Sequence, residues 1–124
     1  DNASPGNRLI PEEKRPRIQV RRWEALADGC TDAAIAVVME KRRPAEQQSP
    51  EWIIRQQAKV DRALQMMADD LAAKNWCTGD FFTLADIAVG CALGYLDFRF
   101  PQVAWRDRHA NLAKLADKLF ARQS

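Results

Sequence analysis

The sequence predicts one all-α domain, a helical bundle of three long helices plus shorter closing helices. Apolar side chains recur at spacings of three and four residues in several separate segments, which is the period of an amphipathic helix. No segment shows the strict apolar and polar alternation of a half-buried strand. The chain has 124 residues, of which 47% are hydrophobic, enough for a single compact core.

The first predicted helix runs from about Glu12 to Arg42. Residues 1–11 precede it, are rich in Asn, Ser, Pro and Gly, and start without methionine, so we expect an interdomain linker there and a helical domain over 12–124. One stripe of the helix, at spacings of three and four, contains Trp23, Leu26, Cys30, Ala33 and Val37. We expect this stripe to face the core.

The second predicted helix begins at Pro50 and runs to about Ala73. Ser49 suits the N-cap position, and Pro50 and Glu51 suit the first turn. The core-facing positions are expected to be Ile53, Val60, Leu64, Met67 and Leu71.

The third predicted helix opens at Thr83 and is apolar nearly all round as far as Phe98, which indicates burial on every side. Thr83 and Asp86 have the spacing of a capping box, in which each side chain accepts a hydrogen bond from the other residue's N–H. Phe82 and Ile87 would form the accompanying hydrophobic staple. An aspartate buried in an apolar segment needs such partners, so Asp86 is predicted to be structural rather than catalytic.

The closing segment is predicted to hold a short helical turn around Trp105 and a last amphipathic helix from about Ala110. The apolar side of that helix consists of Leu112, Leu115, Leu119 and Phe120. Gly90 and Gly94 of the third helix, four residues apart, would let a neighbouring helix approach closely.

Charge and composition exclude several classes of function. The net charge is +2, with 19 basic and 17 acidic residues interleaved, which disfavours nucleic-acid and anionic-membrane partners. The longest apolar run, 84–96, is too short to span a bilayer, and the polar opening is no signal peptide. We therefore expect a cytoplasmic protein with no nucleic-acid and no membrane partner.

Cysteine and histidine usage argues against a disulfide framework and a metal site. Cys30, Cys77 and Cys91 are an odd number with no close pair, which favours a reducing compartment, and each is predicted to be a small buried hydrophobic residue. His109 is the only histidine, so a metal site between helices is not expected.

The segment "TGDFFTLADIAVGCAL" resembles the capping-box motif that opens the central helix of the C-terminal domain of glutathione transferases. The segments "NRLIP", "EALADG", "RPAEQQS" and "GYLDFR" resemble that family in the same order. The resemblance covers essentially the whole chain and is closest to the bacterial, YibF-like group. It implies the helical half of a cytoplasmic homodimer that joins glutathione to a small hydrophobic electrophile. The catalytic Ser, Cys or Tyr of the family lies in a thioredoxin-like N-terminal half, so no catalytic residue is expected in this chain.

The resemblance also implies site residues. "DGCTD" matches the family's Glu/Asp-Gly-x-x-Asp segment, so Asp32 would cross the dimer interface to the ammonium of the partner's glutathione. Pocket candidates by position are Ala33, Ala36, Val37 and Glu40. The residues themselves leave two alternatives open: Asp32 belongs to a solvated acidic stripe with Glu24 and Asp28, and the pocket candidates are ordinary helix packing.

Two other functions remain as alternatives. A domain of this type can be a non-catalytic module for protein–protein interaction. It can also belong to a transferase-like enzyme that retains only peroxidase or thiol-exchange chemistry.

Overall fold

A computed structural model describes residues 10–122, and within that range the fold is all-α, as predicted. Most of the predicted linker, residues 1–9, lies outside the described residues. The only β-type pairing among the described residues is an isolated bridge between Trp76 and Gly79. The elements are α1 (Lys14–Lys41), the short 3-10 helix η2 (Ala45–Gln47), α2 (Pro50–Leu71), α3 (Leu84–Arg99), α4 (Trp105–Arg108) and α5 (Ala110–Arg122).

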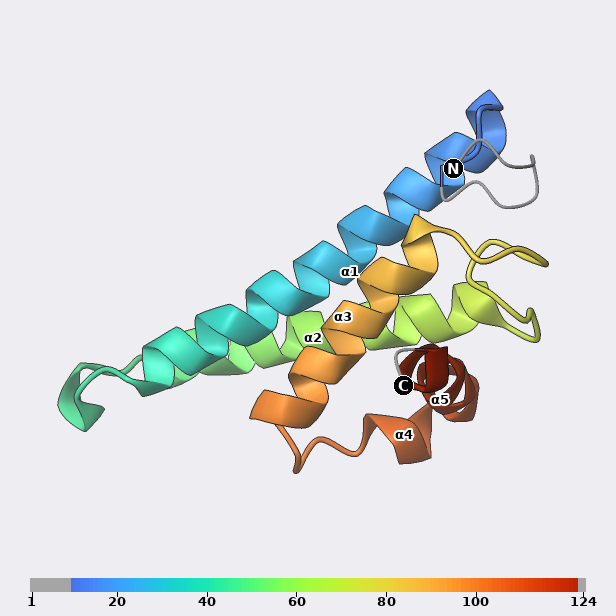
Figure 1. Cartoon of the computed structure of the whole chain (residues 1–124). Helices are drawn as coiled ribbons and strands as arrows, with labels where there is room; N and C mark the ends of the chain where they lie inside the picture. The colour runs from blue at the N-terminus through green and yellow to red at the C-terminus, as the bar shows by residue number, and fades with distance from the viewer. Residues whose placement is uncertain (1–9, 123–124) are drawn as a thin grey trace.

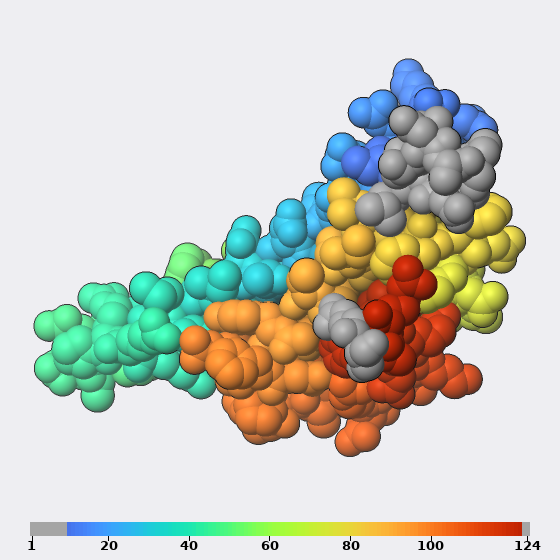
Figure 2. Space-filling model, in the orientation of Figure 1, coloured from blue at the N-terminus to red at the C-terminus, as the bar shows by residue number. Residues whose placement is uncertain are grey.

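Helices α1 and α2 form a long antiparallel hairpin, and the turn that contains η2 extends beyond the rest of the molecule (Figure 1). The space-filling view shows this turn as a narrow projection (Figure 2). Helix α3 packs on α1, and α5 contacts α2, α3 and α4. Both α2 and α3 therefore pack on α1, which is the central element of the core.

Helix α1 buries the apolar stripe that its sequence predicts, and its bounds, Lys14–Lys41, are slightly narrower than expected. Trp23, Cys30, Ala33 and Val37 are buried, and Leu26 is partly buried against the core. The helix begins at Lys14 rather than at Glu12, because the backbone of Glu13 is still extended, with φ −68° and ψ 145°.

Helix α2 is capped at both ends by side chains. The Ser49 Oγ accepts a hydrogen bond from the Trp52 backbone N at 3.2 Å, and Pro50 is the first helical residue. At the other end, the Asn111 Nδ2 of α5 donates to the carbonyl oxygens of Ala68 (2.8 Å) and Ala72 (3.0 Å). The Ala68 carbonyl also accepts from the Ala72 backbone N at 3.0 Å, so the Asn111 amide is a second donor to Ala68 and pairs the Ala72 carbonyl just beyond the helix. The helix ends at residue 71 instead of about 73.

Helix α3 is not buried on every side, so that prediction was wrong. Ile87 is 37% exposed, Phe98 is 72% exposed, and Cys91 is exposed as well. The physical reason is that α1 and α5 cover only part of its circumference. Because the exposed residues are apolar too, the sequence pattern alone could not distinguish covered from uncovered sides.

The glycines of α3 lie against α5, as the sequence predicts. A Cβ added at Gly90 would lie 3.1 Å from the Leu119 Cδ1, and one added at Gly94 would lie 3.8 Å from the Phe120 ring. Gly90 therefore permits the closer approach of the two helices.

Candidate functional site

The acidic stripe of α1 contains one paired and two unpaired carboxylates. Arg21 donates to Glu24 at 2.7 Å. Asp28 and Asp32 are exposed, and neither forms a hydrogen bond or an ion pair with any other residue in the range 10–122. No atom lies within 4 Å of a Cβ added at Gly29, so this side of the helix is open. The stripe can therefore accept a cationic group from another molecule.

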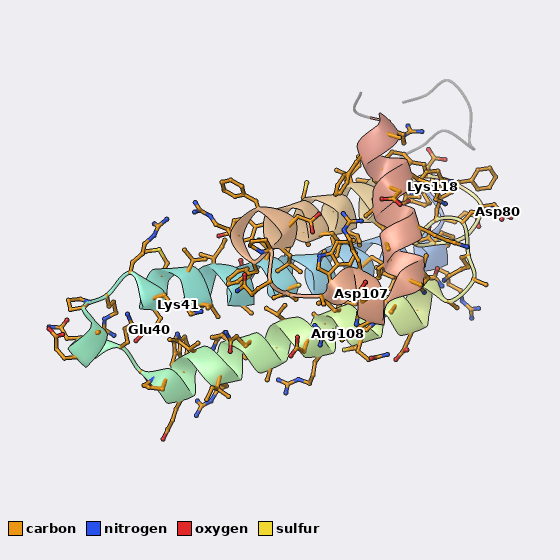
Figure 3. The ribbon with its side chains drawn as sticks, turned by 90° about the horizontal axis from the view of Figure 1, so that it is seen from below. Glu40, Lys41, Asp80, Asp107, Arg108 and Lys118 are labelled. Atoms are coloured by element: carbon orange, nitrogen blue, oxygen red, sulfur yellow. The ribbon has the colours of Figure 1, made fainter. Side chains whose placement is uncertain are left out.

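The four pocket candidates do not line one common surface. Ala33 is 3% exposed and Val37 is 1% exposed, and both belong to the hydrophobic core. Ala36 is half-buried. Glu40 lies near the projecting hairpin turn (Figure 3). Of the four, Val37 borders the cleft between α1, α2 and the segment after α3.

Glu40 has a structural contact that the sequence analysis missed. Its Oε2 accepts a hydrogen bond from the backbone N of Ser49 at 2.7 Å, and its carboxylate pairs with Arg43 at 3.3 Å. The side chain is mostly buried. A carboxylate at the end of α1 thus binds the residue that caps α2, which closes the hairpin. The only sequence signal was an acidic residue at the end of a core stripe.

A capping box opens α3 and is completely buried around Asp86. One carboxylate oxygen of Asp86 accepts from the Thr83 N at 2.9 Å, and the Thr83 Oγ1 accepts from the Ala85 N at 3.2 Å. The other carboxylate oxygen accepts from the Cys77 N at 2.8 Å. Asp86 has no exposed surface. It therefore binds backbone N–H groups both at the start of α3 and in the preceding loop, and it lines none of the three clefts described among residues 10–122.

The ring of Phe82, beside the capping box, contacts Trp76 and Arg122. The Phe82 and Trp76 rings meet edge to face with their centroids 5.2 Å apart, and the Arg122 guanidinium carbon lies 4.1 Å from the Phe82 centroid. Ile87 is more than one-third exposed. A staple between Phe82 and Ile87 stays a prediction.

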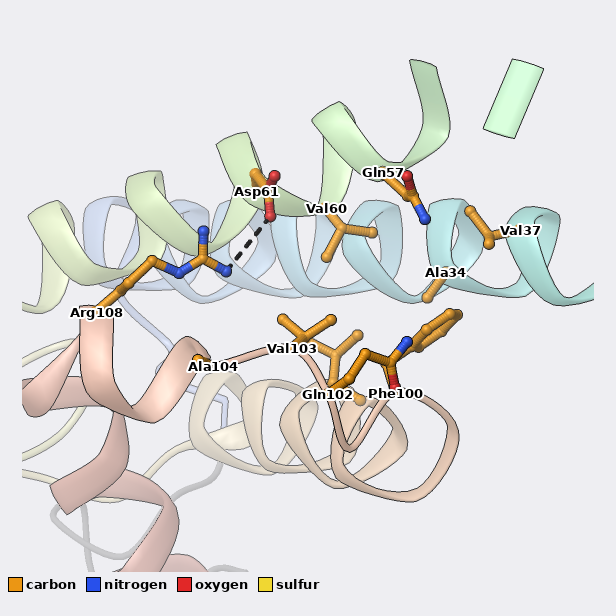
Figure 4. A pocket seen from close by; sticks show the side chains of 11 residues that line it. Ala34, Val37, Gln57, Val60, Asp61, Phe100, Gln102, Val103, Ala104 and Arg108 are labelled. Carbon is orange, nitrogen blue, oxygen red and sulfur yellow. Dashed lines mark ion pairs between the residues drawn. The ribbon is translucent and has the colours of Figure 1, made fainter. Parts of the chain in front are cut away.

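A cleft of about 260 Å³ lies between α1, α2 and the segment that joins α3 to α4 (Figure 4). Its floor is apolar, and Asp61 of α2 and Arg108 of α4 stand at one end, with an N···O distance of 3.7 Å. Gln57 and Gln102 supply amide groups farther along the cleft. Residues of α1, α2, α3 and α4 and of the segment between α3 and α4 all contribute to its lining.

The three thiols are free, and two of them are buried. Burial, reinforced by the charge of Asp61, raises the pKa of Cys30 to about 12. Burial and the nearby Asp86 carboxylate raise the pKa of Cys77 above its usual range. Neither is a reactive thiolate at neutral pH. Cys91 is exposed, so its prediction as a buried residue was wrong.

Among residues 10–122, no group of three or more His, Cys, Asp or Glu side chains is placed to hold a metal ion. No helix in this described part of the chain has the length and apolar character needed to cross a bilayer.

Comparisons with known proteins agree with this architecture. Residues 50–117, over half of the chain, match the family model described as glutathione S-transferase, C-terminal domain. The chain is 39% identical over 123 residues to the uncharacterized GST-like protein YibF of Escherichia coli strain K12. That match covers 99% of this chain and 59% of the relative, so the chain spans well under two thirds of the curated protein's length.

Two solved structures are similar in both sequence and fold. A glutathione S-transferase from Methylobacillus flagellatus KT with glutathione (GSH) bound is 50% identical, with a TM-score of 0.87 over 89% of this chain and 55% of that chain. A glutathione S-transferase from Methylobacterium radiotolerans in complex with glutathione sulfonate is 42% identical, with a TM-score of 0.88 over 92% and 54% of the two chains. The chain therefore belongs to the glutathione S-transferase family and has the fold of that family's C-terminal domain.

Proposed function

We propose that this chain is the helical domain of a cytoplasmic glutathione S-transferase that joins glutathione to a small hydrophobic electrophile. In this proposal residues 1–11 are the interdomain linker and residues 12–124 the helical domain. The observation that carries it is the 50% identity to a transferase with glutathione bound, over 89% of this chain. In this proposal the group that activates the glutathione thiol belongs to a thioredoxin-like half of the full-length protein, because this chain spans 55% of the transferase that it matches.

Asp32 is the residue that we propose contacts glutathione, across a homodimer interface. Its carboxylate is exposed on α1 and has no partner within the described chain. A carboxylate and the γ-glutamyl ammonium would form a charge-assisted hydrogen bond, which contributes about 1.5–3 kcal/mol. Gly29, one turn earlier, leaves the space beside it open. The proposed contribution of the domain is therefore a binding contact rather than a catalytic group.

The test is isothermal titration of glutathione into the full-length dimer with Asp32→Asn and, as a matched control, Asp28→Asn. Both residues are exposed aspartates on the same stripe. We expect Asp32→Asn to weaken glutathione binding about tenfold or more and Asp28→Asn to leave it within about twofold. Equal effects of the two variants would contradict a specific contact at Asp32.

Conjugation itself needs a separate assay. The full-length protein should consume glutathione in the presence of an aromatic electrophile such as chlorodinitrobenzene. If it binds glutathione but forms no thioether, thiol-exchange or peroxidase chemistry becomes the better description. If it has no affinity for glutathione at all, the interaction module becomes the better description.

A further inference from the structure

We propose that the cleft between α1, α2 and residues 100–104 is a binding site for a small neutral alcohol or phenol. The ligand would place an apolar ring or chain on the floor of the cleft and one hydroxyl group between Asp61 and Arg108. This site is separate from Asp32, which does not border the cleft. Ligand binding in this cleft is therefore independent of glutathione binding at Asp32.

The size and lining of the cleft suit a single ring. Four buried apolar residues from three helices form the floor: Ala34, Val37, Val60 and Leu96. Phe100 and Val103 close the cleft from the connecting segment. A dry apolar cavity of about 150 Å³ is large enough to bind benzene, and this cleft has a volume of about 260 Å³. It has room for a ring and one small polar substituent.

The ion pair at the end of the cleft selects the polar substituent. The nearest nitrogen of Arg108 and oxygen of Asp61 are 3.7 Å apart, longer than the roughly 2.7–2.9 Å of a charge-assisted hydrogen bond. Both side chains are about half exposed, so each group retains hydrogen-bonding capacity that a ligand hydroxyl would share with solvent. A hydroxyl group can accept from the guanidinium and donate to the carboxylate at once.

Charged substituents fit this end less well. A ligand carboxylate would pair with Arg108 but face the negative charge of Asp61. A ligand ammonium would pair with Asp61 but face the positive charge of Arg108. The two protein charges cancel, so a neutral group that bonds to both is favoured over either ion.

The experiment is a titration of the 124-residue chain with phenol, toluene, benzoate and benzylammonium, followed by two-dimensional amide NMR. We expect saturable phenol shifts that include Ala34, Val37 and Val60, and an affinity order in which phenol binds most tightly. Val103→Trp, which fills the cleft from its loop side, should abolish the saturable shifts. If that variant does not fold, Gln57→Trp fills the cleft from the exposed side of α2.

The ratio of phenol to toluene affinity tests the role of the ion pair. Arg108→Met should lower this ratio about three- to tenfold, the effect of one hydrogen bond, because toluene has no hydroxyl group to accept from the guanidinium. Arg62→Met, which removes an exposed arginine of α2 that does not line the cleft, is the matched control. The proposal is overturned if phenol does not bind, or if benzoate or benzylammonium binds more tightly than phenol. It is also overturned if Arg108→Met leaves the ratio of phenol to toluene affinity unchanged.

Discussion

Replacement of Asp86 by alanine should cost the domain about 3 kcal/mol of unfolding free energy. The carboxylate accepts hydrogen bonds from the backbone N–H groups of Thr83 at 2.9 Å and Cys77 at 2.8 Å. All three residues are buried, at 0 to 3% exposure, so water cannot replace the lost acceptor. A buried donor left without a partner costs about 1–3 kcal/mol, and two such donors cost about 2–6 kcal/mol.

Two smaller effects oppose each other in this estimate. The variant loses the favourable interaction of a negative charge with the N-terminus of α3, about 0.3–1 kcal/mol. It also no longer has to bury that charge, which recovers part of the desolvation cost. The unpaired donors dominate because both remain buried after the substitution.

Urea denaturation followed by far-ultraviolet circular dichroism measures the effect. Asp80→Ala is the matched control, because Asp80 is exposed in the same loop, and such a surface substitution should change stability by no more than about 0.5 kcal/mol. A loss below about 1 kcal/mol for Asp86→Ala, the value of an ordinary exposed cap, would refute the reasoning that both donors depend on this carboxylate.

Two further predictions concern α3 and α5. Gly94→Ala should stabilise the chain by about 0.5–1 kcal/mol, the helix-propensity difference, whereas Gly90→Ala should gain less or lose stability because its Cβ would lie 3.1 Å from Leu119; equal gains in denaturation midpoint would contradict the close contact. Burial and the adjacent arginine lower the pKa of His109 below its ordinary 6.5, against the opposing charges of two aspartates. The folded state therefore favours neutral His109. The contribution of this residue to the unfolding free energy should be fully present above about pH 6.5 and should be lost as the pH falls below that value. His109→Gln should remove this part of the pH dependence, and identical pH profiles for variant and parent would show that His109 does not contribute.

The helices and their caps were predictable because they depend on residues close together in the sequence. The three- and four-residue spacing places Trp23 and Cys30 on one buried stripe, and the Ser-Pro-Glu sequence that opens α2 marks its start. The bond from the Asp86 carboxylate to the Thr83 N spans three residues, so a local pattern can encode it. The third helix was the exception, because an apolar side chain has the same identity whether or not another helix covers it.

Only the tertiary structure revealed the contacts that join separate segments. The bond from the Cys77 N to Asp86 and the bond from the Ser49 N to Glu40 each span nine residues across a loop. The cleft depends on how α1, α2 and the segment after α3 pack together, and on Asp61 and Arg108 meeting from different helices. Local sequence determines the period and the ends of each helix, because those interactions lie within one or two turns. It does not determine which side chains of different helices meet, since that depends on how the helices pack against one another.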